Sequence, residues 1–145
     1  MPHVTLLYPF RPRSEFDVVA NQMRQACALI QPFEVRLTEF REFRHGRDSH
    51  TLWLAPEPPE ELVRLQAALQ SVVQDCDDTT RYAAGFTPHL SVGQVRGRAA
   101  LARLKNELQD RWAPLWFTLR EVSLIWRNPP PDDVFRVDRT FPLGT

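Results

Sequence analysis

The nonapeptide GFTPHLSVG, residues 85–93, is the stretch from which the fold of this chain is predicted. A second stretch, PHVTLLYPF at residues 2–10, repeats its central pattern of Pro-His, an aliphatic residue and a hydroxyl residue. Both patterns lie in short apolar runs, which are typical of buried β-strands. A strand pattern that occurs twice predicts two similar strands that lie side by side.

The histidine and the hydroxyl residue of each pattern are separated by one position. Side chains in a strand point alternately to opposite faces, so residues i and i+2 share a face. His3 and Thr5 are therefore expected on one face of the first strand, and His89 and Ser91 on one face of the second. Brought together, two imidazoles and two hydroxyls would surround a small anionic group.

Hydrophobic periodicity predicts the elements of the first half of the chain. The strand of residues 3–8 is followed by a helix that begins near Ser14, a favourable N-cap, and ends near Gln31. Residues 33–43 alternate between apolar and polar, which indicates a half-buried strand. Residues 51–55 form the return strand after a polar turn.

The second half repeats this order of strand, helix, amphipathic strand and return strand. A helix over 62–73 precedes the repeat. The repeated elements are then the second histidine strand over 89–95, a helix around 101–108, a strand over 116–126 and a last strand over 134–137. This repeated order indicates a duplication, which would place two equivalent histidine strands about a pseudo-two-fold axis.

The expected fold class is α+β, with two pseudo-symmetric lobes of antiparallel sheet, helices packed outside, and an active-site groove between the lobes. At 145 residues the chain is long enough for one domain with a substantial core. We therefore expect a single domain over 1–145, in which the lobe repeats cover roughly 1–55 and 56–145.

Composition excludes several classes of protein. The formal net charge is zero, so the chain is not a bulk polyanion binder. No apolar run approaches the roughly 20 residues of a membrane span. Cys27 and Cys76 fit no metal-site spacing and are too few for a disulfide framework, so we expect reduced thiols and a cytoplasmic location.

The two motifs resemble the signature of the 2H phosphoesterase superfamily, which contains 2'-5' RNA ligase-like proteins and RNA 2',3'-cyclic phosphodiesterases. That signature is two His-x-Thr/Ser motifs about half a domain apart, here HVT at 3–5 and HLS at 89–91. The family usually carries a strand and a helix before the first motif. This chain is expected to lack that edge, unless a homodimer supplies it in trans.

The resemblance implies a metal-independent phosphodiesterase that opens 2',3'-cyclic phosphate ends of RNA or nucleotides, with reverse 2'-5' RNA ligase activity. One histidine would activate water and the other would protonate the leaving ribose oxygen, since an ordinary imidazole titrates near neutral pH. Thr5 and Ser91 would donate hydrogen bonds to the phosphoryl oxygens. No cofactor is implied. The alternative is a catalytically weak module that binds nucleotides or RNA ends.

Further residues are candidates for substrate contacts. Arg127, at a strand end in the second half, is predicted to reach the phosphate, and Phe86 to stack on a base. His45 and His50 flank the polar turn and are expected to be solvated. The spacing of the four histidines fits no zinc pattern, which argues against a metal site.

Overall fold

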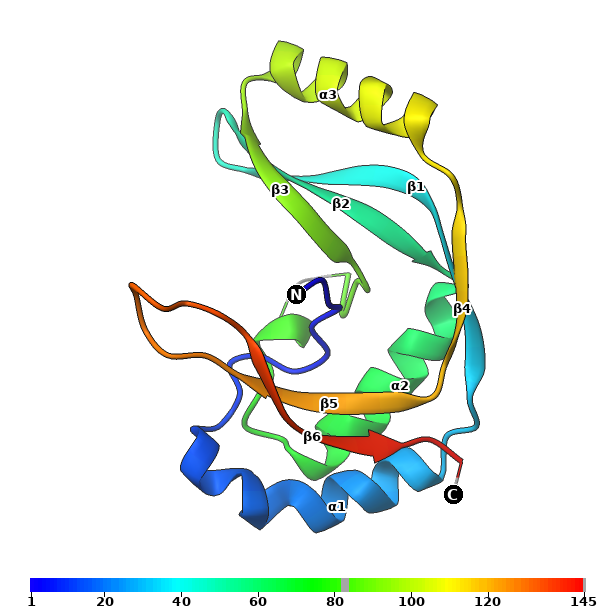
Figure 1. Ribbon diagram of the computed structural model, residues 1–145, viewed down its shortest axis with the longest axis vertical. Coiled ribbons are helices and arrows are strands. Elements are labelled where there is room, and N and C mark those ends of the chain that lie inside the picture. The colour runs from blue at the N-terminus through cyan, green and yellow to red at the C-terminus, as the bar shows by residue number, and fades with distance from the viewer. Residues whose placement is uncertain (82–83, 145) are drawn as a thin grey trace.

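The computed structural model describes residues 1–81 and 84–144 (Figure 1). Its helices are α1 (Phe16–Ala28), α2 (Pro59–Val72) and α3 (Arg98–Arg111), with short 3-10 helices η1 (Arg13–Glu15) and η2 (Asp78–Thr80). Its strands are β1 (Phe33–His45), β2 (Ser49–Glu57), β3 (Leu90–Arg96), β4 (Leu115–Leu119), β5 (Glu121–Trp126) and β6 (Arg136–Pro142). The fold is α+β, as the sequence predicts.

A four-stranded antiparallel sheet, in the order β3-β2-β1-β4, forms one layer. Helix α3 covers its outer face, where Phe40, Leu52 and Leu101 belong to one buried cluster. The side-chain amide of Gln109 fixes α3 to β1, because it accepts from the Phe40 N–H and donates to the Thr38 carbonyl, both at 2.9 Å. The inner face of the sheet is thereby left for other contacts.

The second layer is built from the antiparallel β5–β6 pair and from helices α1 and α2 (Figure 1). The apolar residues that recur at helical spacing in the sequence face this core, as the periodicity predicts. Side chains that are at most 2% exposed here include Phe16, Met23, Leu65, Leu69 and Phe141. Burial of each such side chain contributes about 1.5–3 kcal/mol to folding.

The N-terminal segment lies between the two layers (Figure 1). The prediction of a continuous strand over residues 3–8 is wrong, because only Val4 and Tyr8 make isolated bridges, to Leu90 and Asp77. A strand needs a partner along its length to satisfy its backbone groups. The apolar run alone could not show that such a partner is missing here.

Two other predicted strands have different bounds in the structure. The strand predicted over 116–126 is split at Arg120, because β4 belongs to the four-stranded sheet and β5 to the two-stranded one. The Arg120 carbonyl instead accepts from the Leu143 N–H at 2.8 Å. The last strand, predicted over 134–137, begins and ends later as β6, whose Phe141 is fully buried.

The prediction that His50 is solvated is wrong, since only 4% of this residue is exposed. His50 lies on β2 in phase with Leu52 and Leu54, so the alternation of the strand turns it toward α3. His45 is exposed, as expected, and its Nε2 lies 2.8 Å from the Thr51 hydroxyl.

The four-stranded sheet takes strands from both sides of residue 56, since β1 and β2 begin before it and β3 and β4 follow it. The lobe repeats over 1–55 and 56–145 stay a prediction about the sequence, and the two layers in space do not follow that division. No helix in the described ranges is long and apolar enough to cross a membrane.

Candidate functional site

The two histidine motifs lie side by side. Val4 and Leu90, their middle residues, form an antiparallel bridge. In antiparallel pairing, the neighbours of a bridged pair stand opposite each other, so each histidine faces the hydroxyl residue of the other motif. Alternation along the backbone puts all four side chains on the face opposite to that of the bridged pair. These four are His3, Thr5, His89 and Ser91.

Both imidazoles are held in the same way by their own backbone. His3 Nδ1 lies 2.9 Å from the Met1 carbonyl oxygen, and His89 Nδ1 lies 2.8 Å from the Thr87 carbonyl oxygen. A carbonyl oxygen accepts only, so Nδ1 carries the hydrogen in each ring. The other nitrogen of each neutral ring, Nε2, therefore carries a free lone pair.

The hydroxyls of Thr5 and Ser91 remain available for a ligand. Thr5 is half-buried and Ser91 is exposed at the edge of β3. Within residues 1–81 and 84–144, neither hydroxyl hydrogen-bonds to another protein group. A hydroxyl has one hydrogen to donate, so each can donate to an oxygen of a bound anion.

A phenylalanine ring packs against each histidine. Phe135, just before β6, lies 4.9 Å from the His3 ring with an interplanar angle of 69°. Phe43 of β1 lies 5.0 Å from the His89 ring with an interplanar angle of 89°. Both are edge-to-face arrangements of the kind that aromatic pairs prefer. The sequence did not single out either phenylalanine, because each is one of nine and lies far from its histidine along the chain.

Arg127 lies near the first motif but is already engaged. Its Nη1 is 2.7 Å from an Asp133 carboxylate oxygen. Its guanidinium lies 4.7 Å from the centroid of the Phe135 ring, the same ring that contacts His3. A cation over an aromatic face is a stabilising arrangement. Arg127 therefore packs on Phe135 and pairs with Asp133.

Phe86 has little surface to offer a base, because it is only 9% exposed. It comes shortly before His89 in the segment that leads into β3, and Pro88 beside the histidine is also buried. Stacking of Phe86 on a base stays a prediction that this burial disfavours.

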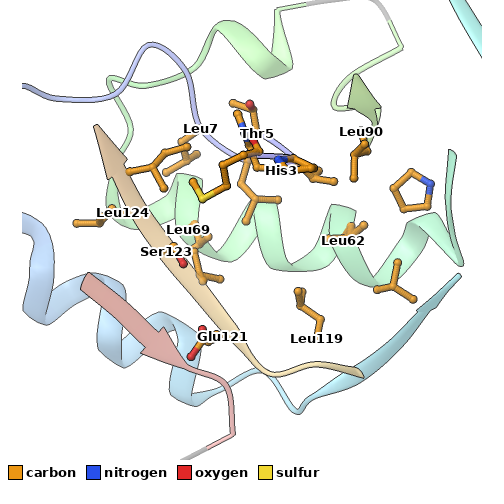
Figure 2. Close-up of a pocket in the computed structure, with 18 of the residues that line it drawn as sticks. His3, Thr5, Leu7, Leu62, Leu69, Leu90, Leu119, Glu121, Ser123 and Leu124 are labelled. Atoms are coloured by element: carbon orange, nitrogen blue, oxygen red, sulfur yellow. Dashed lines mark hydrogen bonds between the residues drawn. The ribbon is translucent and has the colours of Figure 1, made fainter. Parts of the chain in front are cut away.

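A cavity of about 370 Å³ opens beside the first motif (Figure 2). Its walls are mostly apolar and come from the N-terminal segment and from elements that include α2, β4 and β5, with Leu7, Leu62, Leu69, Leu119 and Leu124 among the lining residues. His3 and Thr5 stand at its border, whereas His89 and Ser91 do not line it. The cavity therefore reaches the first motif of the two-histidine site, and it also touches Leu90 of the second.

The described residues contain no group of three or more His, Cys, Asp or Glu side chains placed to hold a metal ion. The polar groups of the site are two imidazoles and two hydroxyls. This set suits proton transfer to and from a bound anion.

A family model described as the 2'-5' RNA ligase superfamily matches residues 1–130, a range that contains both motifs. The chain belongs to this superfamily. The resemblance to the 2H phosphoesterases is thereby confirmed. Membership in the 2'-5' RNA ligase superfamily also places the protein among phosphoesterase and ligase-type enzymes.

Two solved structures share the fold. One is the crystal structure of TT0787 of Thermus thermophilus, with a TM-score of 0.70 and 21% identity. The other is that of E. coli LigT complexed with 3'-AMP, with a TM-score of 0.70 and 14% identity. Each match covers 99% of this chain and 78% of the other chain. No curated protein matches the sequence.

Proposed function

We propose that this protein is a metal-independent phosphodiesterase that opens 2',3'-cyclic phosphate ends of RNA or nucleotides. The observation that carries the proposal is the bridge between Val4 and Leu90, because it turns both imidazoles and both hydroxyls to one face. Membership in the 2'-5' RNA ligase superfamily supports this reaction class. The 3'-AMP bound to LigT supports a nucleotide ligand.

Hydrolysis of the cyclic diester uses the two free Nε2 atoms. One neutral imidazole removes a proton from water as the water oxygen attacks phosphorus. The other imidazole, protonated at Nε2, gives its proton to the ribose oxygen as the P–O bond breaks. Acid-base catalysis of this kind contributes about 10²–10⁴-fold to a rate. Since both rings donate Nδ1–H to a carbonyl, His3 and His89 are equally equipped for either role.

The hydroxyls act on the phosphoryl group itself. Negative charge builds on its non-bridging oxygens as the water adds, and donors fixed in advance stabilise that charge. Thr5 and Ser91 supply one such donor from each motif. The same groups support the reverse reaction, in which a 5'-hydroxyl takes the place of water and a 2'-5' linkage forms.

Arg127 and Phe86 are left out of the proposed substrate contacts. The guanidinium of Arg127 is bound by Asp133, and the Phe86 ring is buried. We place the activity in the cytoplasm, because Cys27 and Cys76 are free thiols and reduced thiols are typical of that compartment.

The test uses 2',3'-cyclic nucleotides and a short oligonucleotide that ends in a 2',3'-cyclic phosphate. The wild-type protein is expected to open both kinds of ring, and H3A and H89A are each expected to lose about 10³-fold or more in turnover. R103A is the control, because Arg103 is exposed on α3, which covers the outer face of the sheet, and should leave turnover unchanged.

Near wild-type turnover in either H3A or H89A would contradict the mechanism. The alternative function, a catalytically weak binding module, predicts a different pattern. The wild-type protein would then bind a nucleotide such as 3'-AMP in calorimetry but would turn over neither cyclic substrate.

A further inference from the structure

The rings of His3 and His89 need a second point of support. The hydrogen bond at Nδ1 fixes one atom of each ring, but the ring plane can still tilt about that atom, because the χ2 torsion of histidine is broad. A tilt moves Nε2, which lies across the ring from the bond. A hydrogen bond weakens steeply as it departs from linear geometry, so a tilted ring is a poorer partner for proton transfer.

The edge-to-face phenylalanine contacts supply that support. A flat ring packed against the imidazole opposes tilting in a way that a single hydrogen bond does not. The two contacts are matched in distance, at 4.9 Å for His3–Phe135 and 5.0 Å for His89–Phe43. Each pair joins a motif to a separate part of the chain, so neither contact follows from local sequence.

Phe43 is itself held in place by Trp53. The two rings stack with centroids 4.6 Å apart and an interplanar angle of 22°. Trp53 is only 5% exposed and also contacts the His89 ring, with centroids 5.9 Å apart. Because Phe43 and Trp53 stand on the paired strands β1 and β2, the sheet fixes both rings.

Phe135 is held in place by charged side chains. The Arg127 guanidinium covers its ring at 4.7 Å and is bound by Asp133. On the other side of Phe135 in the chain, Arg136 makes two hydrogen bonds to the carboxylate of Asp132, at 2.9 and 3.0 Å. The segment between β5 and β6 is thus fixed at both ends around Phe135.

We propose that Phe43 and Phe135 are matched positioning residues, each holding one catalytic imidazole so that its Nε2 faces the shared phosphoryl group. The proposal rests on the proposed function, because it concerns the same two histidines. It also gives Arg127 a role, which is to hold Phe135 in place.

The kinetic test replaces each ring by an aliphatic side chain of similar apolar character. F43L and F135L are expected to lower kcat about 10- to 100-fold, since small misplacements of a catalytic group have effects of that size. KM is expected to change less than about threefold, because an interaction that acts only in the transition state leaves substrate binding intact. F43Y and F135Y keep the ring and should retain most of kcat.

F40L is the matched control. Phe40 lies on the same strand as Phe43 and makes a similar edge-to-face contact, with Trp112 at 5.4 Å. That contact lies on the outer face of the sheet, toward α3. F40L should lower the melting temperature at least as much as F43L while leaving kcat unchanged.

A second measurement does not depend on turnover. Long-range ¹H–¹⁵N correlation spectra of the free protein report the tautomer and ordering of each imidazole. We expect the Nδ1–H form for both rings in the wild type, a change confined to His89 in F43L, and a change confined to His3 in F135L.

Unaltered imidazole signals in both leucine variants would overturn the proposal. So would a rise in KM at constant kcat, which would assign the rings to substrate binding, or kcat losses no larger than that of F40L. If the wild-type protein opens no cyclic phosphate, the proposed function fails, and the spectra still decide whether the phenylalanines order the histidines.

Discussion

His3 lies diagonally from His89 across the bridge that joins their motifs. Diagonal neighbours in an antiparallel pair are about 7–8 Å apart, farther than residues that face each other directly. This separation suits an in-line displacement, in which the attacking and leaving oxygens lie on opposite sides of phosphorus. In the proposed mechanism the two histidines would act from opposite ends of one axis, and each histidine has a hydroxyl residue opposite it.

Removal of either hydroxyl should slow the chemical step. T5V and S91A are each expected to lower kcat about 100-fold, the typical effect of losing one donor to a developing oxyanion. KM should change much less. Steady-state kinetics on a 2',3'-cyclic nucleotide measures both constants. T118V is the control, because Thr118 is exposed on β4, and equal losses in T118V and T5V would argue against the assignment.

His50 should be replaceable with a gain in stability. Within the described ranges, neither of its ring nitrogens has a hydrogen-bond partner, although the residue is buried beneath α3. Burial of an unpaired polar group costs about 1–3 kcal/mol. H50L is therefore expected to raise the free energy of unfolding by about 1 kcal/mol in urea titrations. A loss of stability in H50L, with H45L unchanged, would show that the imidazole contributes to the fold.

Acid should weaken the connection between β6 and η1, the short helix just before α1. Hydrogen bonds from Arg139 and Arg13 hold the pKa of Asp138 below its usual value. A lowered carboxyl pKa contributes stability that is present above about pH 4 and is lost as the pH falls through the folded-state pKa. The melting temperature of D138N should therefore fall less between about pH 5 and pH 2 than that of the wild type. D110N, an exposed control, should follow the wild type.

Both cysteines should resist thiol reagents in the folded protein. Burial raises the pKa of Cys27 to about 11, and burial is also the main cause of the raised pKa of Cys76. The thiolate is the reactive form, so little of it is present at pH 8. A colorimetric thiol assay should detect almost no reactive thiol in the native protein and two thiols per chain in denaturant. Fast labelling of the native protein would contradict the buried positions.

Features that depend on repeated motifs or on periodic spacing of apolar residues can be predicted from the sequence. The two His-x-Thr/Ser motifs, the order of helices and the α+β class all follow from local pattern, and the apolar spacing of α1 correctly marks Phe16 and Met23 as core. The burial of His50 also follows from local pattern, since it is in phase with Leu52 and Leu54. The polar turn beside it favours the opposite prediction, which is wrong because strand alternation decides the direction of the side chain.

Other features depend on parts of the chain that meet only after folding. The break at Arg120 places β4 and β5 in different sheets, although the amphipathic pattern runs through it without interruption. The isolated bridge at Val4 replaces a predicted strand, because the segment lacks a continuous partner. The contacts of Phe43 and Phe135 join residues far apart in the chain, which no local pattern reports.

The bridge between Val4 and Leu90 also joins two separately packed cores. Leu90 packs on the cluster beneath α3, whereas Leu7, next to the first motif, belongs to the cluster of α1 and α2. Proteins open in cooperative units smaller than the whole, so two separately packed cores can part before either one unfolds. Parting of these cores would separate His3 from His89 while both cores stay folded. Warming should therefore inactivate the protein at a lower temperature than the one at which it melts.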